Sequence, residues 1–272
     1  MLDSLRRSRG LLVAVLVVAV VIVGAAVVVA TTDASLSPFG LGPGTHEQLA
    51  PGVSHNGTVN VTRLLAAHRS RLYERGFNST IVVLSRSNGS VAVASGQRMT
   101  ATPNLTRVLT QQNRSVPGGQ NTTATTYANE SATDVRLAVG GNETYRVGTR
   151  TQTPTVPPIS RATVSVLREA ADTFTVANVT ESGGQRRVTL TATTTRSINE
   201  TGVWTTVRMV VTGQGVIRSL HIHSGTDGGR QVLAYRYSLG KLGVDSVARP
   251  EWVGSIPSNA TEVTPGQRSQ GR

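Results

Sequence analysis

The 272-residue chain contains no cysteine. This absence excludes disulfides, thiolate metal sites, cysteine nucleophiles and a lipid attached to an N-terminal cysteine. Aromatic residues make up only 4% of the chain, and Lys241 is its only lysine, although the formal net charge is +12. Gly, Thr, Ser and Val are abundant, which is typical of β-structure with many turns. The length allows one or two domains.

One stretch lacks polar side chains altogether, from Leu11 to Ala30. As a helix it would be about 30 Å long, which matches the hydrocarbon core of a bilayer. Arg6, Arg7 and Arg9 precede it, so the positive-inside rule places residues 1–10 in the cytoplasm and the bulk of the chain outside. We therefore predict a single-pass signal-anchor helix in the cell membrane.

The alternative for this stretch is a signal peptide cleaved near Val28, Val29 and Ala30. Apolar signal regions usually run about 7–15 residues, so the greater length here favours an uncleaved anchor. Arg6 and Arg7 also resemble a twin-arginine export signal, but Arg9 lies where that signal becomes hydrophobic. Each of these interpretations exports most of the chain.

Asparagine never occurs outside one triplet pattern. All 12 Asn are followed two residues later by Ser or Thr, and none has Pro between. With 60 Ser and Thr in the chain, random placement would give about three matches. Asn that only marks turns, as in Asn88-Gly89, would not need this hydroxyl. We predict N-glycosylation among Asn56, Asn60, Asn78, Asn88, Asn104, Asn113, Asn121, Asn129, Asn142, Asn178, Asn199 and Asn259.

The composition divides the exported part into three segments. Residues 31–52 are rich in Pro, Gly, Ser and Thr and are predicted to be a flexible stalk. Residues 53–254 are predicted to form one extracellular α+β domain, a mainly antiparallel, twisted sheet with two helices covering one face. Residues 255–272 are predicted to be a disordered polar tail.

Two helices are predicted in this domain. Apolar side chains recur at helical spacing before Gly76, a typical C-terminal cap, and they are Val61, Leu64, Leu65, His68 and Leu72. The second helix is predicted over Ser160–Phe174. Residues 104–118 are ambiguous, with a short helix over Leu105, Val108 and Leu109 as one interpretation.

The strands are predicted from β-branched runs between turn signals. "SNGS" at residues 87–90 is a strong hairpin signal between two such runs. The predicted strands are 77–85, 91–101, 122–128, 134–139, 144–151, 174–180, 186–195, 203–212, 216–223 and 230–239.

Sites for chemistry are few. His221 and His223 share one face of a predicted strand and could supply two metal ligands, but a third would have to come from elsewhere. The alternative is two solvent-facing residues beside a turn, and we predict no metal site from this pair alone. No Gly-x-Ser-x-Gly elbow and no Gly-rich phosphate loop occurs, so we predict no enzyme activity and no cofactor.

The arginines are dispersed and no aromatic platform accompanies them, which argues against nucleic acid. After residue 30 the charge is still +10, from 24 basic and 14 acidic residues. Such a surface could attract anionic lipid or acidic envelope polymers. Alternatively, arginine only keeps a Thr-rich surface soluble.

Five short motifs carry a resemblance to a known family: "LAPGV" at 49–53, "LLAAHRSRL" at 64–72, "GQGVIRSLHI" at 213–222, "YRYS" at 235–238 and "RPEWV" at 249–253. They resemble a haloarchaeal family of surface lipoproteins. That family is similar to the half-barrels of lipoprotein carriers and lipid-binding lipoproteins of the LolA/LppX type. It typically carries an acceptor Cys for a lipid anchor, which residues 11–30 would replace here.

The resemblance implies a curved antiparallel half-barrel whose apolar concave face could hold a lipid or other hydrophobic ligand. The first functional hypothesis is therefore a non-enzymatic, membrane-anchored, N-glycosylated surface protein that binds such a ligand. The second hypothesis is a structural or adhesive envelope glycoprotein without a ligand pocket.

Overall fold

Long strands with many β-branched residues dominate the part of the chain that the computed structural model describes, residues 48–150, 159–198, 201–258 and 260–262. The strands are β1 (Gln48–Ala50), β2 (Val53–Ser54), β3 (Phe77–Ser87), β4 (Ser90–Ala101), β5 (Val108–Ser115), β6 (Thr122–Ala128), β7 (Ala132–Val139), β8 (Asn142–Thr149), β9 (Thr175–Ser182), β10 (Gln185–Ile198), β11 (Thr201–Thr212), β12 (Ile217–Thr226), β13 (Gln231–Leu242) and β14 (Thr261–Glu262). The helices are α2 (Val61–Arg75), α3 (Arg161–Glu169) and the 3-10 turns η1 (Pro103–Leu105), η2 (Ala171–Thr173) and η3 (Glu251–Ser255).

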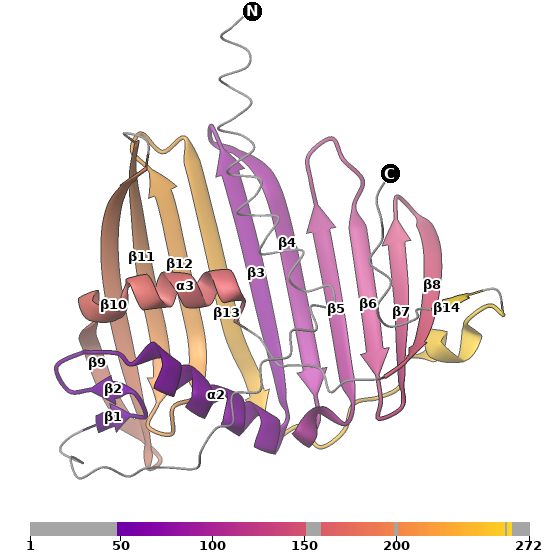
Figure 1. The fold of residues 1–272 in the computed structure, drawn as a ribbon, viewed down its shortest axis with the longest axis horizontal. Coiled ribbons are helices and arrows are strands. Elements are labelled where there is room, and N and C mark those ends of the chain that lie inside the picture. The colour runs from indigo at the N-terminus through magenta and orange to yellow at the C-terminus, as the bar shows by residue number, and fades with distance from the viewer. Residues whose placement is uncertain (1–47, 151–158, 199–200, 259, 263–272) are drawn as a thin grey trace, which may run out of the picture.

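Twelve of these strands form one sheet in the order β14-β8-β7-β6-β5-β4-β3-β13-β12-β11-β10-β9 (Figure 1). The pairs are antiparallel, except that β14 runs parallel to β8. Register shifts interrupt the pairings β9–β10, β11–β12, β13–β3 and β3–β4. Such bulges bend strands, and the result is a half-barrel-like sheet. The predicted α+β class with a mainly antiparallel sheet is confirmed.

Helix α2 forms as predicted. The Asn60 side chain accepts a hydrogen bond from the Arg63 N–H at the first turn, and Gly76 ends the helix with a φ of 64°. All five residues of the predicted apolar stripe are buried: Val61, Leu64, Leu65, His68 and Leu72. The second helix is shorter than predicted, because α3 ends at Glu169 and a separate 3-10 turn, η2, leads into β9.

Helices α2 and α3 cover the same face of the sheet, over β9–β13 and β3 (Figure 1). We call this the inner face and the opposite one the outer face. The main core lies between the helices and the inner face, where Leu190, Met209 and Tyr237 are buried. A second, smaller cluster contains Tyr127, Val244, Val247 and Val253, with Leu109 packed against it.

These two clusters explain why residues 104–118 were ambiguous. The interpretation as a short helix is wrong beyond the 3-10 turn η1, because Val108 begins strand β5. Val108 belongs to the main core, whereas Leu109 packs on the second cluster on the other side of the sheet. A strand that is apolar on both faces loses the two-residue alternation that identifies strands.

The ends of the domain extend beyond the predicted bounds. In the predicted stalk, Gln48–Ala50 forms strand β1, and Leu49 and Ala50 are buried in the main core. In the predicted tail, Ile256 packs on the second cluster, and β14 pairs with β8. Short apolar sequences in both segments therefore belong to the folded domain.

The predicted membrane anchor at residues 11–30 lies outside the described residues, as does most of the predicted stalk. Within the described ranges, no helix is both long enough and apolar enough to span a bilayer.

Candidate functional site

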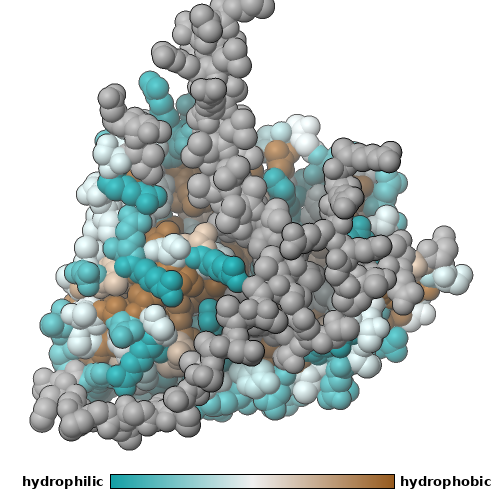
Figure 2. All heavy atoms as spheres, in the orientation of Figure 1, coloured by the Kyte–Doolittle hydropathy of each residue, from teal (hydrophilic) through white to brown (hydrophobic). Residues whose placement is uncertain are grey.

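The inner face combines a packed core with a small group of buried polar side chains around His68. Figure 2 shows apolar side chains between charged and polar ones around α2 and α3 on this side of the molecule. Under α2, His68 is buried, with an exposed fraction of 1%. Its Nδ1 accepts a hydrogen bond from the Ile217 N–H at 3.2 Å, and its Nε2 lies 3.4 Å from the Tyr237 hydroxyl. Because Nδ1 is an acceptor, Nε2 carries the proton and donates to Tyr237.

This histidine is neutral at physiological pH. Burial, aided by the charge of Arg69, lowers the pKa of His68 from 6.5 to about 3. Burial also raises the pKa values of Tyr235 and Tyr237 above their usual range, and the Thr163 side chain of α3 hydrogen-bonds Tyr235. These groups satisfy one another inside the core, so their role is structural.

Beyond the helices, the inner face bears a row of aliphatic side chains on β7. Val135, Leu137 and Val139 pair with Thr126, Ala124 and Thr122 of β6, and they alternate with outer-face residues such as Arg136. All three are half-buried, and they belong to neither core cluster of the described residues. We call Val135, Leu137 and Val139 the β7 apolar row. These three side chains could contact a hydrophobic ligand.

The outer face has a different chemistry. Strand register places Arg208 of β11 opposite His221 of β12, and His221 opposite Arg236 of β13. All three side chains are exposed, and together they form what we call the cationic row. Thr191 of β10 continues this row on one side, as the partner of Arg208.

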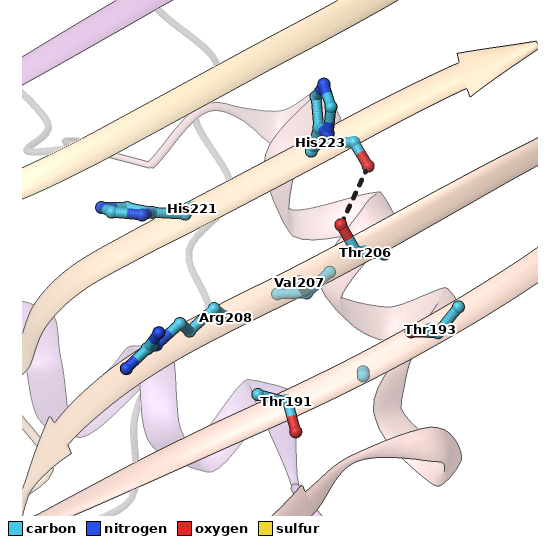
Figure 3. Close-up of a pocket in the computed structure, with 8 residues that line it drawn as sticks. Thr191, Thr193, Thr206, Val207, Arg208, His221 and His223 are labelled. Atoms are coloured by element: carbon cyan, nitrogen blue, oxygen red, sulfur yellow. Dashed lines mark hydrogen bonds between the residues drawn. The ribbon is translucent and has the colours of Figure 1, made fainter. Parts of the chain in front are cut away.

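A pocket of about 270 Å³ opens beside the cationic row (Figure 3). Arg208 and His221 extend in the same direction from neighbouring strands, and Thr206 donates a hydrogen bond to the His223 carbonyl at 3.4 Å. The residues that line the pocket are Thr191, Ala192, Thr193, Thr206, Val207, Arg208, His221 and His223.

The electrostatics of this pocket favour anions over cations. Partial burial lowers the pKa of His221, and the positive charges of Arg236 and Arg208 lower it further. The same two guanidinium groups would repel a metal ion. Among the described residues, no group of three His, Cys, Asp or Glu could hold a metal.

The two histidines do share a face, as predicted. They point outward on either side of the buried Ile222. His223 packs edge-on against the indole of Trp204, with ring centroids 4.9 Å apart. Arg208 and Arg236, which give this face its charge, were not singled out by sequence reasoning.

The predicted glycosylation sites lie mostly at the surface. Of the twelve Asn, Asn199 and Asn259 lie outside the described residues. Asn78 and Asn129 are half-buried. The Nδ2 of Asn78, where a glycan would attach, donates a hydrogen bond to the Thr100 hydroxyl at 2.9 Å. The Oδ1 of Asn129 accepts a hydrogen bond from the Ser131 N–H. The exposed ones are Asn56, Asn60, Asn88, Asn104, Asn113, Asn121, Asn142 and Asn178. Glycosylation requires such exposure but does not follow from it, so it stays a prediction.

No protein-family model matches the chain, and no curated protein matches it. Two solved structures resemble it distantly. A LolA superfamily protein from Nitrosomonas europaea has 7% identity and a TM-score of 0.20, over 70% of this chain and 96% of that one. A β-barrel-like protein of a domain of unknown function from Brucella abortus has 10% identity and a TM-score of 0.21, over 63% and 98%.

At these TM-scores neither likeness supports a functional argument. The relation to haloarchaeal surface lipoproteins stays a prediction.

Proposed function

We propose that the chain is a membrane-anchored, N-glycosylated cell-surface protein that binds a lipid or other hydrophobic ligand on its inner face and is not an enzyme. The observation that carries the binding proposal is the β7 apolar row. Three aliphatic side chains on the helix-covered side of the sheet belong to neither core cluster of the described residues. Burying them under an acyl or isoprenoid chain would be favourable by about 25 cal/mol for each Å² of apolar surface.

The anchor and the glycans are supported by sequence alone. The 20 apolar residues at 11–30 match a bilayer, and the universal Asn-x-Ser/Thr pattern matches the glycan acceptor. The non-enzymatic role is supported by the core, where His68 is neutral and uses both ring nitrogens in structural contacts.

Lipid binding is tested on protein extracted from its own membranes in mild detergent. Bound lipid per chain is measured by solvent extraction and mass spectrometry, with the detergent alone as blank. The test variant is Val135→Thr with Val139→Thr, because Thr matches Val in shape and keeps a high strand propensity. The control is Val82→Thr with Val210→Thr, since both valines lie on the outer face, where Val82 is exposed and Val210 is half-buried like the test pair.

We expect the inner-face pair to reduce bound lipid several-fold and the control pair to leave it unchanged. Thermal unfolding of both pairs shows whether they are folded. The proposal would be wrong if the native protein contained no more lipid than the detergent blank. It would also be wrong if the test pair and the control pair lost the same amount of bound lipid.

The second hypothesis, an envelope component that contacts neighbouring polymers, is favoured by a separate observation. The cationic row is exposed on the outer face, away from the β7 apolar row. The two surfaces have different chemistries and can be tested independently.

A further inference from the structure

The cationic row places an arginine on either side of one histidine, with no acidic residue opposite any of the three. Pairs of opposite charge across neighbouring strands stabilise a sheet, and this row has none. Here Arg208, His221 and Arg236 lie side by side on three strands. The ion pairs found among the described residues involve other arginines, namely Arg71, Arg136, Arg186 and Arg196.

The surrounding strands provide no acidic partner on this face. In the described parts of β9–β13, the outer positions are occupied by Thr, Ser, Asn, Gln, His, Arg and small or apolar residues. Glu181 of β9 lies on the other face, where it pairs with Arg186. The Asp227 carboxylate packs over Gly202, and Gly202 lies six residues away from Arg208 along β11. The positive charge of the row is therefore left for a ligand to compensate.

We propose that this outer-face pocket binds an acidic sugar, a carboxylated or sulfated unit of an envelope polysaccharide. In this proposal Arg208 of the pocket lining and Arg236, which lies beside the pocket on β13, hold the oxyanion, and the threonine hydroxyls hold the sugar. Guanidinium groups are well suited to carboxylates and sulfates because they donate several parallel hydrogen bonds. The site lies on the opposite face from the proposed lipid surface and does not depend on it.

The rest of the lining fits a sugar better than a bare anion. Thr191, Thr193 and Thr206 place three hydroxyls beside the row. Each can accept a hydrogen bond, and the Thr206 hydroxyl already donates to the His223 carbonyl. Trp204 adds an amphipathic ring next to His223. Its indole lies over Gly225, where an added Cβ would come within 2.5 Å of the ring, so this glycine is needed to seat the indole.

His221 makes the binding dependent on pH. It faces Arg208 on β11 and Arg236 on β13, and the nearest titratable group on its own strand is His223. Because partial burial and the charges of Arg236 and Arg208 lower its pKa below 6.5, His221 is largely neutral at pH 7. A bound carboxylate or sulfate would offset the two guanidinium charges and raise the pKa of His221. By linkage, affinity increases as the pH falls toward 5.

The experiment measures binding of the full chain in detergent to oligogalacturonate, a carboxylated sugar, and to dextran oligomers as a neutral control. The test variant is Arg208→Gln with Arg236→Gln. The control is Arg86→Gln with Arg98→Gln, which removes the same charge from exposed arginines on the outer face of β3 and β4. Histidine NMR signals follow the pKa of His221 with and without the acidic oligomer.

We expect oligogalacturonate to bind and dextran not to bind. The test pair should lose affinity by about tenfold or more, because charge-assisted hydrogen bonds are lost, and the control pair by less than about twofold. The pKa of His221 should rise on binding. Equal losses from both pairs would show that net charge alone attracts the polymer, and the proposal would be wrong. If the protein binds inorganic sulfate but does not bind oligogalacturonate, the pocket holds an adventitious ion only, and the proposal is wrong.

Discussion

His68 couples the stability of the core to pH through one imidazole. In the folded protein its pKa is about 3, whereas an exposed histidine titrates near 6.5. Between these values the unfolded chain binds a proton that the folded chain does not. The free energy of unfolding therefore decreases as the pH falls from 6.5 toward 3, by up to about 1.4 kcal/mol per pH unit.

The substitution His68→Gln removes this titration while keeping an acceptor for the Ile217 N–H and a donor for Tyr237. Urea unfolding at pH 7.5 and pH 5 compares the two proteins. We expect the stability advantage of the native chain over the variant to shrink by about 2 kcal/mol between these pH values. An advantage that does not change with pH would show that His68 is solvated and titrates normally.

At the same scale, the outward direction of His221 and His223 was predictable but their partners were not. A simple hairpin around Gly213–Gly215 that kept the Val211–Ile217 pairing would place Leu220 opposite Arg208. The register instead shifts by one residue between Val210 and Val211, so His221 takes that position. A shift of one residue exchanges the two faces of a strand, and the sequence does not mark where a bulge falls.

At the scale of elements, α2 begins at a residue with two uses. The Asn60 Oδ1 caps the helix by accepting from Arg63 at 2.9 Å, and its Nδ2 is the predicted point of glycan attachment. Since the two atoms differ, one side chain can do both. The substitutions Asn60→Asp and Thr62→Ala each abolish the acceptor triplet but keep an oxygen for the cap.

We expect both variants to lose one glycan mass. Asn60→Asp should be as stable as the native chain or slightly more stable, because a carboxylate at a helix N-terminus interacts favourably with its dipole. Asn60→Ala should lose the same glycan mass and also about 1 kcal/mol of stability. Mass spectrometry of the peptide and thermal unfolding measure the two effects. If the peptide mass changes only by the mass of the substitution in all three variants, Asn60 carries no glycan.

Elements with one buried face were predicted best. The buried stripe of α2 and the hairpin of β3 and β4 follow from periodicity and from turn residues, which are local signals. Strand β5, whose first two residues pack on opposite faces of the sheet, and β1 and β14, which are only two or three residues long, carry no such signal. Their structure depends on contacts with distant parts of the chain.

At the scale of the whole molecule, the sheet separates two chemistries. The inner face carries the main core and the β7 apolar row, whereas the outer face carries the cationic row and the predicted acceptor residues Asn113 and Asn178. A surface protein with this arrangement could hold a hydrophobic ligand on one side and contact acidic polymers on the other. Glycans on the outer face would have to leave the pocket at His221 open.

The proposed anchor and glycans predict the mass of the native protein. The bare chain weighs 28.6 kDa. Protein extracted from its own membranes in detergent should be heavier, and chemical deglycosylation should return it to 28.6 kDa with residues 1–30 retained.

The variant Asn88→Gln, at an exposed hairpin turn, should lose one glycan mass. Asn78→Gln should lose none, because the Nδ2 of Asn78 is hydrogen-bonded to Thr100. A bare and shortened chain would instead indicate cleavage of the leader and unmodified asparagines, and both predictions would be wrong.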